Sequence, residues 1–280
     1  MFKELTSRSE HLALARLSSS ARRLLAYADE QGGLGLTPGG ALKRVHVNHA
    51  AEVFDWPGHT PEELYRLNKV LNEEDVFPLW VLHHLLLHTR HARHSKKMFH
   101  PTKAGRALID APSRAFNEIV PRFLLEVDHA GMGRVWTAIP GRLAEYLDAL
   151  NLAAGDWICV KVLAERLLGP ARDQAWDPRP LSLYVAVIRP LVWCGLLLEE
   201  DGGRSNSRVM KSPLWHEALA LPSDEALEPR GWLNEALNVR LGRGQALTSQ
   251  TGMVRRNAFS RRESGDGATL PCCRARFERW

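Results

Sequence analysis

The chain has 280 residues, of which 45% are hydrophobic and 25% charged, with a formal net charge of +5. These fractions are ordinary for a soluble globular protein of about two domains, and 21 Gly, 16 Pro and 4 Cys exclude collagen-like, wholly disordered and disulfide-scaffold classes. The charge is uneven: residues 238–280 carry nine Arg, no Lys and three acids, which leaves residues 1–237 with a net charge of −1.

The N-terminal residues do not read as a secretory signal, because Glu10, His11 and Arg16 interrupt the apolar residues. The longest apolar stretches, at residues 80–87 and 191–198, fall well short of the roughly 20 residues that a membrane-spanning helix needs. We therefore expect a cytoplasmic protein that has no membrane partner.

A helix is expected at residues 21–30, where Leu24, Leu25 and Tyr27 share one apolar face. The segment that follows, residues 34–42, weakly repeats the Thr-x-x-Gly-x-Ala/Leu pattern of residues 102–108. This similarity predicts a third, weaker copy of a unit that is clearer further along the chain.

The clearest copy of that unit runs from Phe77 to Leu108. Apolar residues at helical spacing predict a helix that ends near His88, and a polar segment then leads to Met98. Thr102 is placed to cap a further short helix. The order predicts a helix, a two-stranded wing and a closing helix.

A second copy occupies residues 181–221. Its helix is expected to stop at Gly195, and an Asp-Gly-Gly turn at residues 201–203 predicts a hairpin. Ser212 and Pro213 then begin the closing helix. Aligning the two copies leaves four extra residues in the second hairpin.

Helices rich in Leu and Ala, separated by short hairpins, resemble the winged-helix superfamily, with the module used two or three times. The Leu-Thr-x-x-Gly-x-Leu and Leu-Leu-Leu-Glu-Glu-Asp-Gly-Gly segments are similar to those of uncharacterised bacterial plasmid-type proteins with tandem modules of this kind. The resemblance covers residues 20–110 and 155–221 and transfers no site residue. It implies a mainly α fold with short β-hairpins, arranged as tandem winged-helix-like modules.

Gly and Pro cluster at residues 131–140 and indicate a boundary between two halves. The expected organisation is an N-terminal winged-helix-like region at residues 1–130 and a second winged-helix-like domain at residues 131–237. A basic, disordered tail is expected at residues 238–280, which have no sustained apolar period.

The segment from His83 to Arg106 has the most unusual local composition, with six His, six Lys or Arg and no acid. Winged-helix modules that bind DNA place a basic hairpin on phosphate or in the minor groove. The alternative is that a solvated wing of an interaction module is basic. The residues expected to contact DNA are Arg90, Arg93, Lys96, Lys97, Lys103 and Arg106.

Two other kinds of site are not expected. His84, His88 and His91 would share one helical face if the helix continued through Thr89, and could then bind Zn²⁺. No neighbouring Cys, Asp or Glu completes a ligand set, so outward-facing histidines and no metal or other cofactor are expected. The sequence has no phosphate-binding loop, nucleophile elbow or dinucleotide-binding glycine motif. The acid runs at residues 73–75 and 199–201 are typical of helix ends or turns in water rather than of a nuclease.

We therefore expect a non-enzymatic protein that binds double-stranded DNA through its basic wing, in the manner of a transcriptional regulator. The alternative is a protein-interaction or assembly module that binds a protein partner or itself and does not contact DNA. For this alternative, the acidic second hairpin, Glu199 to Asp201, argues against contact of both wings with phosphate.

Overall fold

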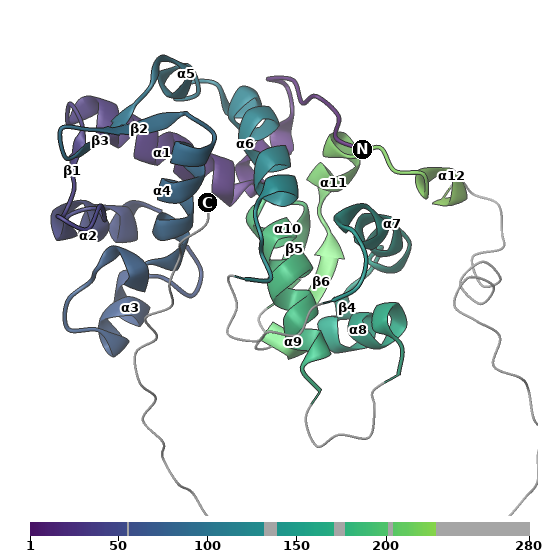
Figure 1. Ribbon diagram of the computed structural model, residues 1–280. Helices are drawn as coiled ribbons and strands as arrows, with labels where there is room; N and C mark the ends of the chain where they lie inside the picture. The colour runs from purple at the N-terminus through teal and green to yellow at the C-terminus, as the bar shows by residue number, and fades with distance from the viewer. Residues whose placement is uncertain (55, 132–138, 171–176, 201–203, 228–280) are drawn as a thin grey trace, which may run out of the picture. The chain divides into compact units, whose positions relative to one another are not determined.

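The structure is a computed structural model that describes residues 1–54, 56–131, 139–170, 177–200 and 204–227 (Figure 1). Residues 1–233 form one unit and residues 234–280 another, and all described residues belong to the first. The predicted tail, the turn at residues 201–203 and most of the predicted boundary at residues 131–140 lie outside the described residues.

The described chain is mainly helical with two small antiparallel sheets, as the fold-class prediction has it at this coarse level. The first half supplies one sheet and the helices around it. Its elements are η1 (Glu10–Leu14), α1 (Arg16–Glu30), β1 (Leu34–Gly35), α2 (Arg44–Val53), α3 (Pro61–Leu67), η2 (Glu73–Asp75), α4 (Phe77–His88), β2 (Ala92–Ser95), β3 (Met98–Pro101), α5 (Lys103–Arg106) and α6 (Pro112–Glu126).

The second half contains the other sheet. Within it, α9, the π-helix η3 and α10 follow one another without a gap. Its elements are α7 (Leu143–Ala153), β4 (Ile158–Cys159), α8 (Val160–Leu168), α9 (Arg179–Leu183), η3 (Tyr184–Ile188), α10 (Arg189–Trp193), β5 (Leu197–Glu200), η4 (Arg204–Asn206), β6 (Arg208–Lys211), α11 (Pro213–Ala218) and α12 (Asp224–Leu227).

Local sequence explains where several elements begin and end. The buried stripe of α1, which includes Leu17, Leu24 and Leu25, has the spacing of a helix packed on one side. The side chain of Thr102 accepts a hydrogen bond from the Gly105 amide and so caps α5, as predicted. Gly195 ends the helix before the second hairpin with φ 74°, a value that glycine adopts without a steric penalty.

The two sheets have the same topology. Strand order is β1-β3-β2 in the first and β4-β6-β5 in the second, and every pair is antiparallel. The edge strands β1 and β4 contribute only two residues each, with Leu34 opposite Phe99 and Ile158 opposite Val209. A short strand, helices, a hairpin and a closing helix therefore occur twice, which confirms the predicted repeat.

Equivalent hydrogen bonds fix both hairpins at equivalent positions. The Thr102 hydroxyl donates to the carbonyl of Arg90, and the Ser212 hydroxyl donates to that of Gly195. Two pairs of backbone bonds also match: Leu36 N to Lys97 O with Val160 N to Ser207 O, and Thr102 N to His91 O with Ser212 N to Leu196 O.

The structure corrects two details of the predicted repeat. Seven residues separate β5 from β6 and two separate β2 from β3, so the second hairpin is longer by five residues and not by four. Residues 34–42 are not a third copy, because they form β1 and a turn closed by a Leu36–Leu42 bridge. The next helix begins at Arg44, and the Thr37 amide bonds the Ala41 carbonyl within the turn.

The halves meet through the helices that precede the hairpins, which we call the pre-hairpin helices: α4 in the first half and α9–η3–α10 in the second. Trp193 of α10 lies 4.9 Å from Trp56, 5.7 Å from Phe77 of α4 and 6.2 Å from Phe123 of α6, measured between ring centroids. The Arg189 guanidinium lies 5.1 Å from the Phe77 ring centroid. Aromatic packing of this kind stabilises the contact beyond the buried area alone.

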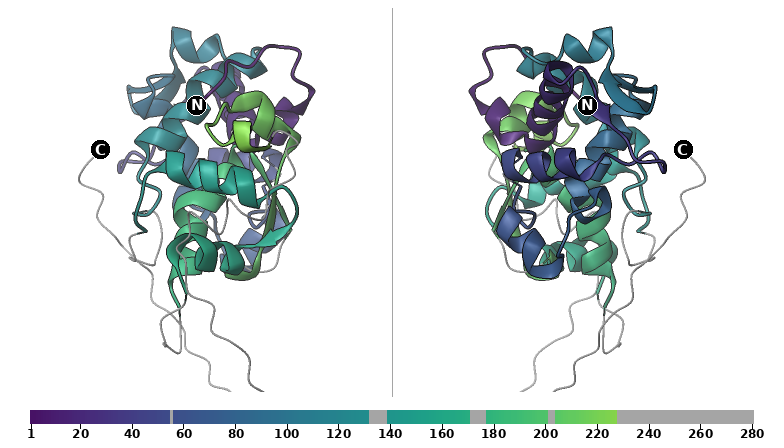
Figure 2. Two further views of the ribbon diagram at one scale, coloured as in Figure 1. Left: turned by 90° about the vertical axis from the view of Figure 1, so that its right-hand side faces the viewer. Right: turned by 90° about the vertical axis from the view of Figure 1, so that its left-hand side faces the viewer.

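The N-terminal segment also joins the halves. Phe2 forms a β-bridge with Leu219, and the Asn117 side chain of α6 exchanges two 3.0 Å hydrogen bonds with the backbone of Leu5. Figure 2 shows this purple segment beside the green helix α11, where Glu217 contacts Ser9 and His11. Residues from the two ends of the described chain are therefore packed together.

No helix within the described ranges is both long and apolar enough to cross a membrane.

Candidate nucleic-acid interface

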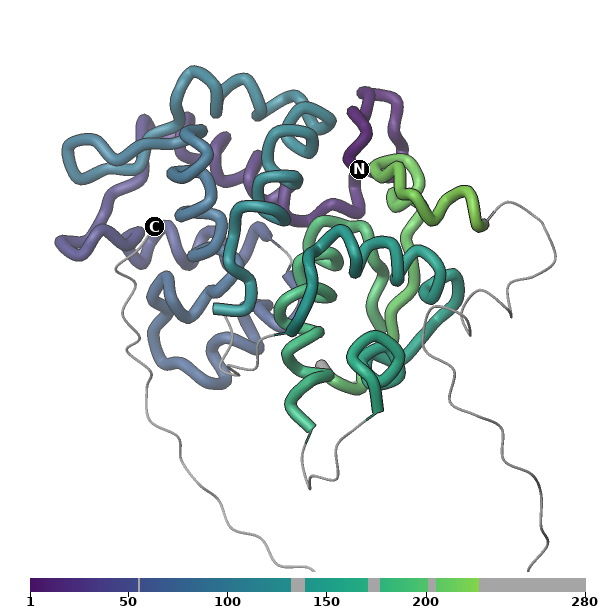
Figure 3. Tube along the Cα trace, turned by 45° about the vertical axis from the view of Figure 1, so that its right-hand side comes forward, coloured from purple at the N-terminus to yellow at the C-terminus, as the bar shows by residue number. Residues whose placement is uncertain are grey.

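The predicted wing of the first half is the hairpin β2–β3, residues 92–101, which we call the basic hairpin. Figure 3 shows it as a narrow loop that extends away from α4. Directly opposed residues share a face, so Ala92, Phe99 and Pro101 face the core and are buried. Arg93 lies opposite His100 on the other face and is exposed.

Two lysines make the tip of the basic hairpin. Lys96 and Lys97 are its two turn residues, with φ 51° and 60°, the sign that a tight hairpin turn of the primed type requires. Such turns favour Asn-Gly, and each non-glycine residue in this region costs about 1–2 kcal/mol. The turn therefore places two exposed cations at the tip at a cost in backbone energy.

All six residues predicted to contact DNA are exposed. Arg106 on α5 pairs with Asp29 of α1 through Nε and Oδ1 at 2.5 Å, so part of its charge is neutralised. Among the described residues the other five form no ion pair: Arg90, Arg93, Lys96, Lys97 and Lys103.

These cations divide between the tip and the root of the basic hairpin. A four-residue strand spans ~13 Å, so the turn lysines lie roughly that distance from Arg90, Lys103 and Arg106 at the root. Arg93 lies between the two groups. The structure therefore brings the six residues to one hairpin and its flanks, and does not gather them at a single point.

The second half lacks the equivalent charges. The positions equivalent to Arg90, Arg93 and Lys103 are occupied in the second half by Gly195, Leu198 and Pro213. Glu200 of β5 instead forms a cross-strand ion pair with Arg208 of β6, at 3.1 Å between Oε2 and Nη1. A basic hairpin is therefore a property of the first half within the described chain.

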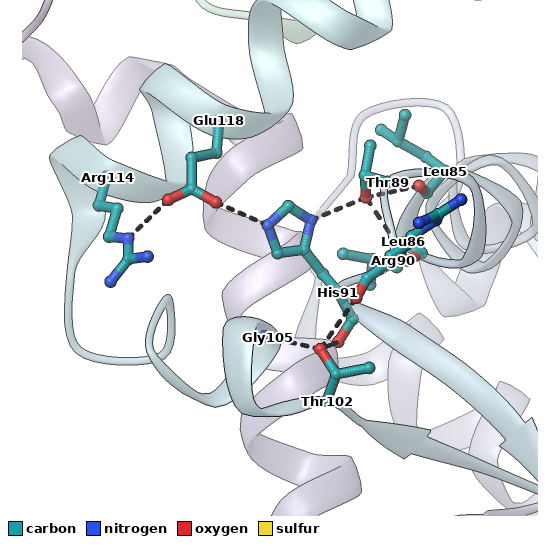
Figure 4. A network of polar contacts seen from close by, with 9 residues as sticks. All are labelled: Leu85, Leu86, Thr89, Arg90, His91, Thr102, Gly105, Arg114 and Glu118. Carbon is teal, nitrogen blue, oxygen red and sulfur yellow. Dashed lines mark hydrogen bonds and ion pairs between the residues drawn. The ribbon is translucent and has the colours of Figure 1, made fainter.

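His91 anchors the root of the basic hairpin to α6 (Figure 4). Its side chain is only 4% exposed, and its Nε2 lies 2.8 Å from Oε2 of Glu118, while its Nδ1 lies 2.8 Å from the Thr89 hydroxyl. Arg114 binds the other oxygen of Glu118 at 2.6 Å. Burial alone would raise the pKa of the Glu118 carboxyl, but the bonds from Arg114 and His91 lower it.

A second chain of polar contacts holds the core-facing side of the basic hairpin. His94 of β2 places its Nε2 2.7 Å from Nε2 of His83 on α4. His83 Nδ1 lies 2.5 Å from Oε1 of Glu73, whose Oε2 accepts a hydrogen bond from the Leu42 amide. Glu73 and His83 are each 1% exposed. We call these residues the Glu73–His83–His94 chain.

The structure corrects the interpretation of the first acid run. Glu74 is exposed, as expected for an acidic turn in water, but Glu73 is buried and bonded to His83. The sequence offered no signal for this contact, because the two residues are ten positions apart and belong to different elements. His83 lies among apolar residues on the buried face of α4, and a buried histidine in such a position needs a hydrogen-bond partner.

The histidines considered as metal ligands are used differently. Helix α4 ends at His88 and Arg90 is left-handed, so the condition for a shared face is not met: His91 lies outside the helix that carries His84 and His88. His84 Nδ1 lies 2.8 Å from the Trp80 carbonyl, and His88 pairs with Glu126. No group of three or more His, Cys, Asp or Glu in the described residues is arranged to hold a metal ion.

The pre-hairpin helices expose little of their surface. In α4 only His84 and His88 are exposed, and Trp193 of α10 is 9% exposed. These are the helices that precede the hairpins, and the contact between the halves covers part of both. A ligand therefore has access to the basic hairpin rather than to these helices.

Comparisons with known proteins agree on one family. The family model described as the Y4jL N-terminal domain matches residues 13–114, which include α1, the first sheet and the basic hairpin. The uncharacterized protein y4jL of Sinorhizobium fredii (strain NBRC 101917 / NGR234) is 37% identical over 158 residues, which are 55% of this chain and 71% of the relative. No solved structure matches the chain. The chain therefore belongs to the y4jL family of uncharacterised bacterial proteins, the plasmid-type group that its sequence resembles.

Proposed function

We propose that this protein is a non-enzymatic DNA-binding protein of the transcription-regulator type, and that the basic hairpin is its contact with double-stranded DNA. The observation that carries the proposal is the set of five exposed cations on and beside one hairpin that form no ion pair in the described chain. Cations of this kind bind phosphates and release counterions, which supplies affinity without base recognition.

Each half is proposed to be a winged-helix module. The repeated strand order, with the last strand of the hairpin in the middle of the sheet, and the helices before the hairpin support this assignment. In such modules the helix before the wing enters the major groove. Here that helix is largely buried, so we propose that the wing supplies most of the contact and that sequence selectivity is low.

Replacement of Arg93, Lys96 and Lys97 by Ala tests the proposal. Loss of three phosphate contacts should lower the slope of log K against log salt concentration by about 2.7 for a duplex, because each contact contributes about 0.9. The measurement is fluorescence anisotropy of a labelled duplex at several salt concentrations. A matched control replaces three exposed cations elsewhere, Arg122, Lys161 and Arg166, and should leave the slope unchanged.

The second candidate is an assembly module that binds a protein partner or a second copy and does not contact DNA. The burial of the pre-hairpin helices at the contact between the halves favours it, because the surface that reads bases in winged-helix proteins is used for packing. An unchanged duplex affinity and salt slope in the Arg93, Lys96 and Lys97 variant would reject the DNA proposal and leave this candidate.

A further inference from the structure

The Glu73–His83–His94 chain runs from a buried carboxylate to the basic hairpin, and the proposed function makes no use of it. Glu73 and His83 are almost completely buried, whereas His94 remains accessible to solvent. A buried carboxylate is costly unless hydrogen bonds or an opposite charge compensate it. The arrangement of protons along the chain therefore has consequences at the hairpin surface.

The facing Nε2 atoms of His83 and His94 allow one proton between them. At 2.7 Å, two N–H groups or two lone pairs would repel each other, so one ring donates and the other accepts. With Glu73 ionised, the Nδ1–H of His83 points to the carboxylate, and a neutral His83 then offers a lone pair at Nε2. His94 is therefore the donor, through its own Nε2–H.

This arrangement accepts one further proton without losing a contact. Protonation of His94 at Nδ1 leaves its Nε2–H bond to His83 intact and places an imidazolium in series with the buried Glu73 carboxylate. A proton added to both rings would instead set two N–H groups against each other. The Glu73–His83–His94 chain can therefore gain one positive charge while all of its hydrogen bonds are kept.

We propose that the Glu73–His83–His94 chain makes duplex binding by the basic hairpin proton-dependent, with His94 as the group that gains charge on acidification. The inference rests on the proposed function and specifies its regulation. His94 lies next to Arg93 and two residues from Lys96, so its imidazolium adds to the positive potential that attracts phosphate.

The surroundings of His94 place this charge change below neutral pH. Burial lowers the pKa of His94 from its ordinary value, His83 and His84 of α4 lower it further, and Glu73 of η2 opposes them by raising it. Strand β3 presents the uncharged Phe99 to the same ring. The hairpin therefore lacks this charge at pH 7.5 and gains it at a lower pH than an ordinary histidine would.

The test follows the salt slope of duplex binding from about pH 7.5 downwards, over the range in which the protein stays folded, in the wild-type protein and two His→Asn variants. On acidification the slope should increase by about one more in the wild-type protein than in His94→Asn, because the His94 imidazolium is one more cation and contributes about 0.9. His94→Asn should remove this part of the increase. His100→Asn is the matched control, because His100 lies on the basic hairpin but does not belong to the Glu73–His83–His94 chain. This variant should retain the increase that depends on His94.

Glu73→Gln supplies an independent readout far from any phosphate. The Gln oxygen is needed to accept the Leu42 N–H, so the Gln NH2 group faces His83, donates to its Nδ1 and forces the Nε2–H tautomer. Protonation of His94 would then oppose two N–H groups. The pKa of His94, followed by NMR through its ring protons, should fall in this variant, and the pH response of binding should disappear. Thermal unfolding monitors whether the variant folds.

The outcomes separate the two proposals. If the wild type and His94→Asn show the same pH response while the tip lysines still control binding, the inference is wrong and the proposed function stands. If the wild type binds no duplex at any pH in this range, both fail. An unchanged His94 pKa in folded Glu73→Gln would refute the proton arrangement directly.

Discussion

Arg90 and Gly195 occupy equivalent positions in the two halves, each being the left-handed residue that follows a pre-hairpin helix, with φ 60° and 74°. Each carbonyl accepts a hydrogen bond from the hydroxyl that begins the closing helix, Thr102 in the first half and Ser212 in the second. The same backbone geometry therefore carries a cation in one half and no side chain in the other.

Substitutions at these two positions should have opposite effects on stability. Arg90→Gly should raise the free energy of unfolding by about 0.5–1 kcal/mol, because glycine adopts this φ without a clash. Gly195→Ala should lower it by at least about 2 kcal/mol, since its Cβ would lie 2.5 Å from the Leu14 carbonyl carbon. Urea unfolding followed by circular dichroism measures both. A Gly195→Ala protein as stable as the wild type would contradict the repeat geometry.

The strained tip predicts a trade between stability and binding. Replacing Lys96 by Asn and Lys97 by Gly should raise the free energy of unfolding by about 1–2 kcal/mol, because Asn-Gly suits a turn with two positive φ angles. The same change should lower the salt slope of duplex binding by about two. The Lys96→Arg, Lys97→Arg double variant keeps the charge and the strain, and should change neither quantity. Equal stability of the Asn-Gly and wild-type proteins would show that the turn is not strained.

His129 predicts a loss of stability in acid. Burial lowers its pKa to about 4, and its Nε2–H donates to the Phe123 carbonyl. The unfolded protein therefore binds the second ring proton of His129, which makes the imidazolium, more tightly than the folded protein does. The contribution is complete above pH 6.5 and is lost as the pH falls from 6.5 towards 4. The difference between the ordinary histidine pKa and the value of about 4 in the folded protein corresponds to about 3 kcal/mol of unfolding free energy.

Unfolding free energies measured across this range test the assignment. His129→Gln keeps a donor for the Phe123 carbonyl and removes the titrating group, so its stability should fall less between pH 6.5 and 4 than that of the wild type. Parallel curves for the two proteins would mean that His129 does not contribute.

The hydrogen bond between His91 and Glu118 should stabilise the root of the basic hairpin. Glu118→Ala leaves the buried Nε2–H of His91 without its acceptor and should lower the free energy of unfolding by about 1–2 kcal/mol. Glu118→Gln keeps an acceptor oxygen and should cost less than half as much. Equal losses in the two variants would indicate that side-chain packing, rather than the hydrogen bond to His91, accounts for the effect.

Sequence patterns predicted the elements that depend on local signals. The helix that ends at His88, the capped turn at Thr102 and the stop at Gly195 follow from apolar spacing, a capping hydroxyl and a glycine. The strands β1 and β4 could not be predicted in this way, because two residues show no alternation. Thr37 is a residue type that often caps helices, but here it lies in a turn. For this reason the prediction of a third copy was wrong.

Contacts between distant segments account for what the sequence did not indicate. Glu73 looked like part of a solvated acid run, yet it is buried because His83 and the Leu42 amide converge on it. Likewise, the packing of Trp193 against Phe77 joins residues more than a hundred positions apart. The basic character of the hairpin was visible in composition, but the arrangement that supports it depends on tertiary structure.

The contact between the first residues and α11 imposes an order on folding during synthesis. The Met1 carbonyl accepts a hydrogen bond from the Ala220 amide, and Lys3 N donates to the Ala218 carbonyl. A ribosome adds residues in order from the N-terminal side, so the backbone groups of Met1 and Lys3 lack these partners until synthesis has reached Ala220. The backbone contact between the N-terminal segment and the end of α11 can therefore form only after the second hairpin has been made.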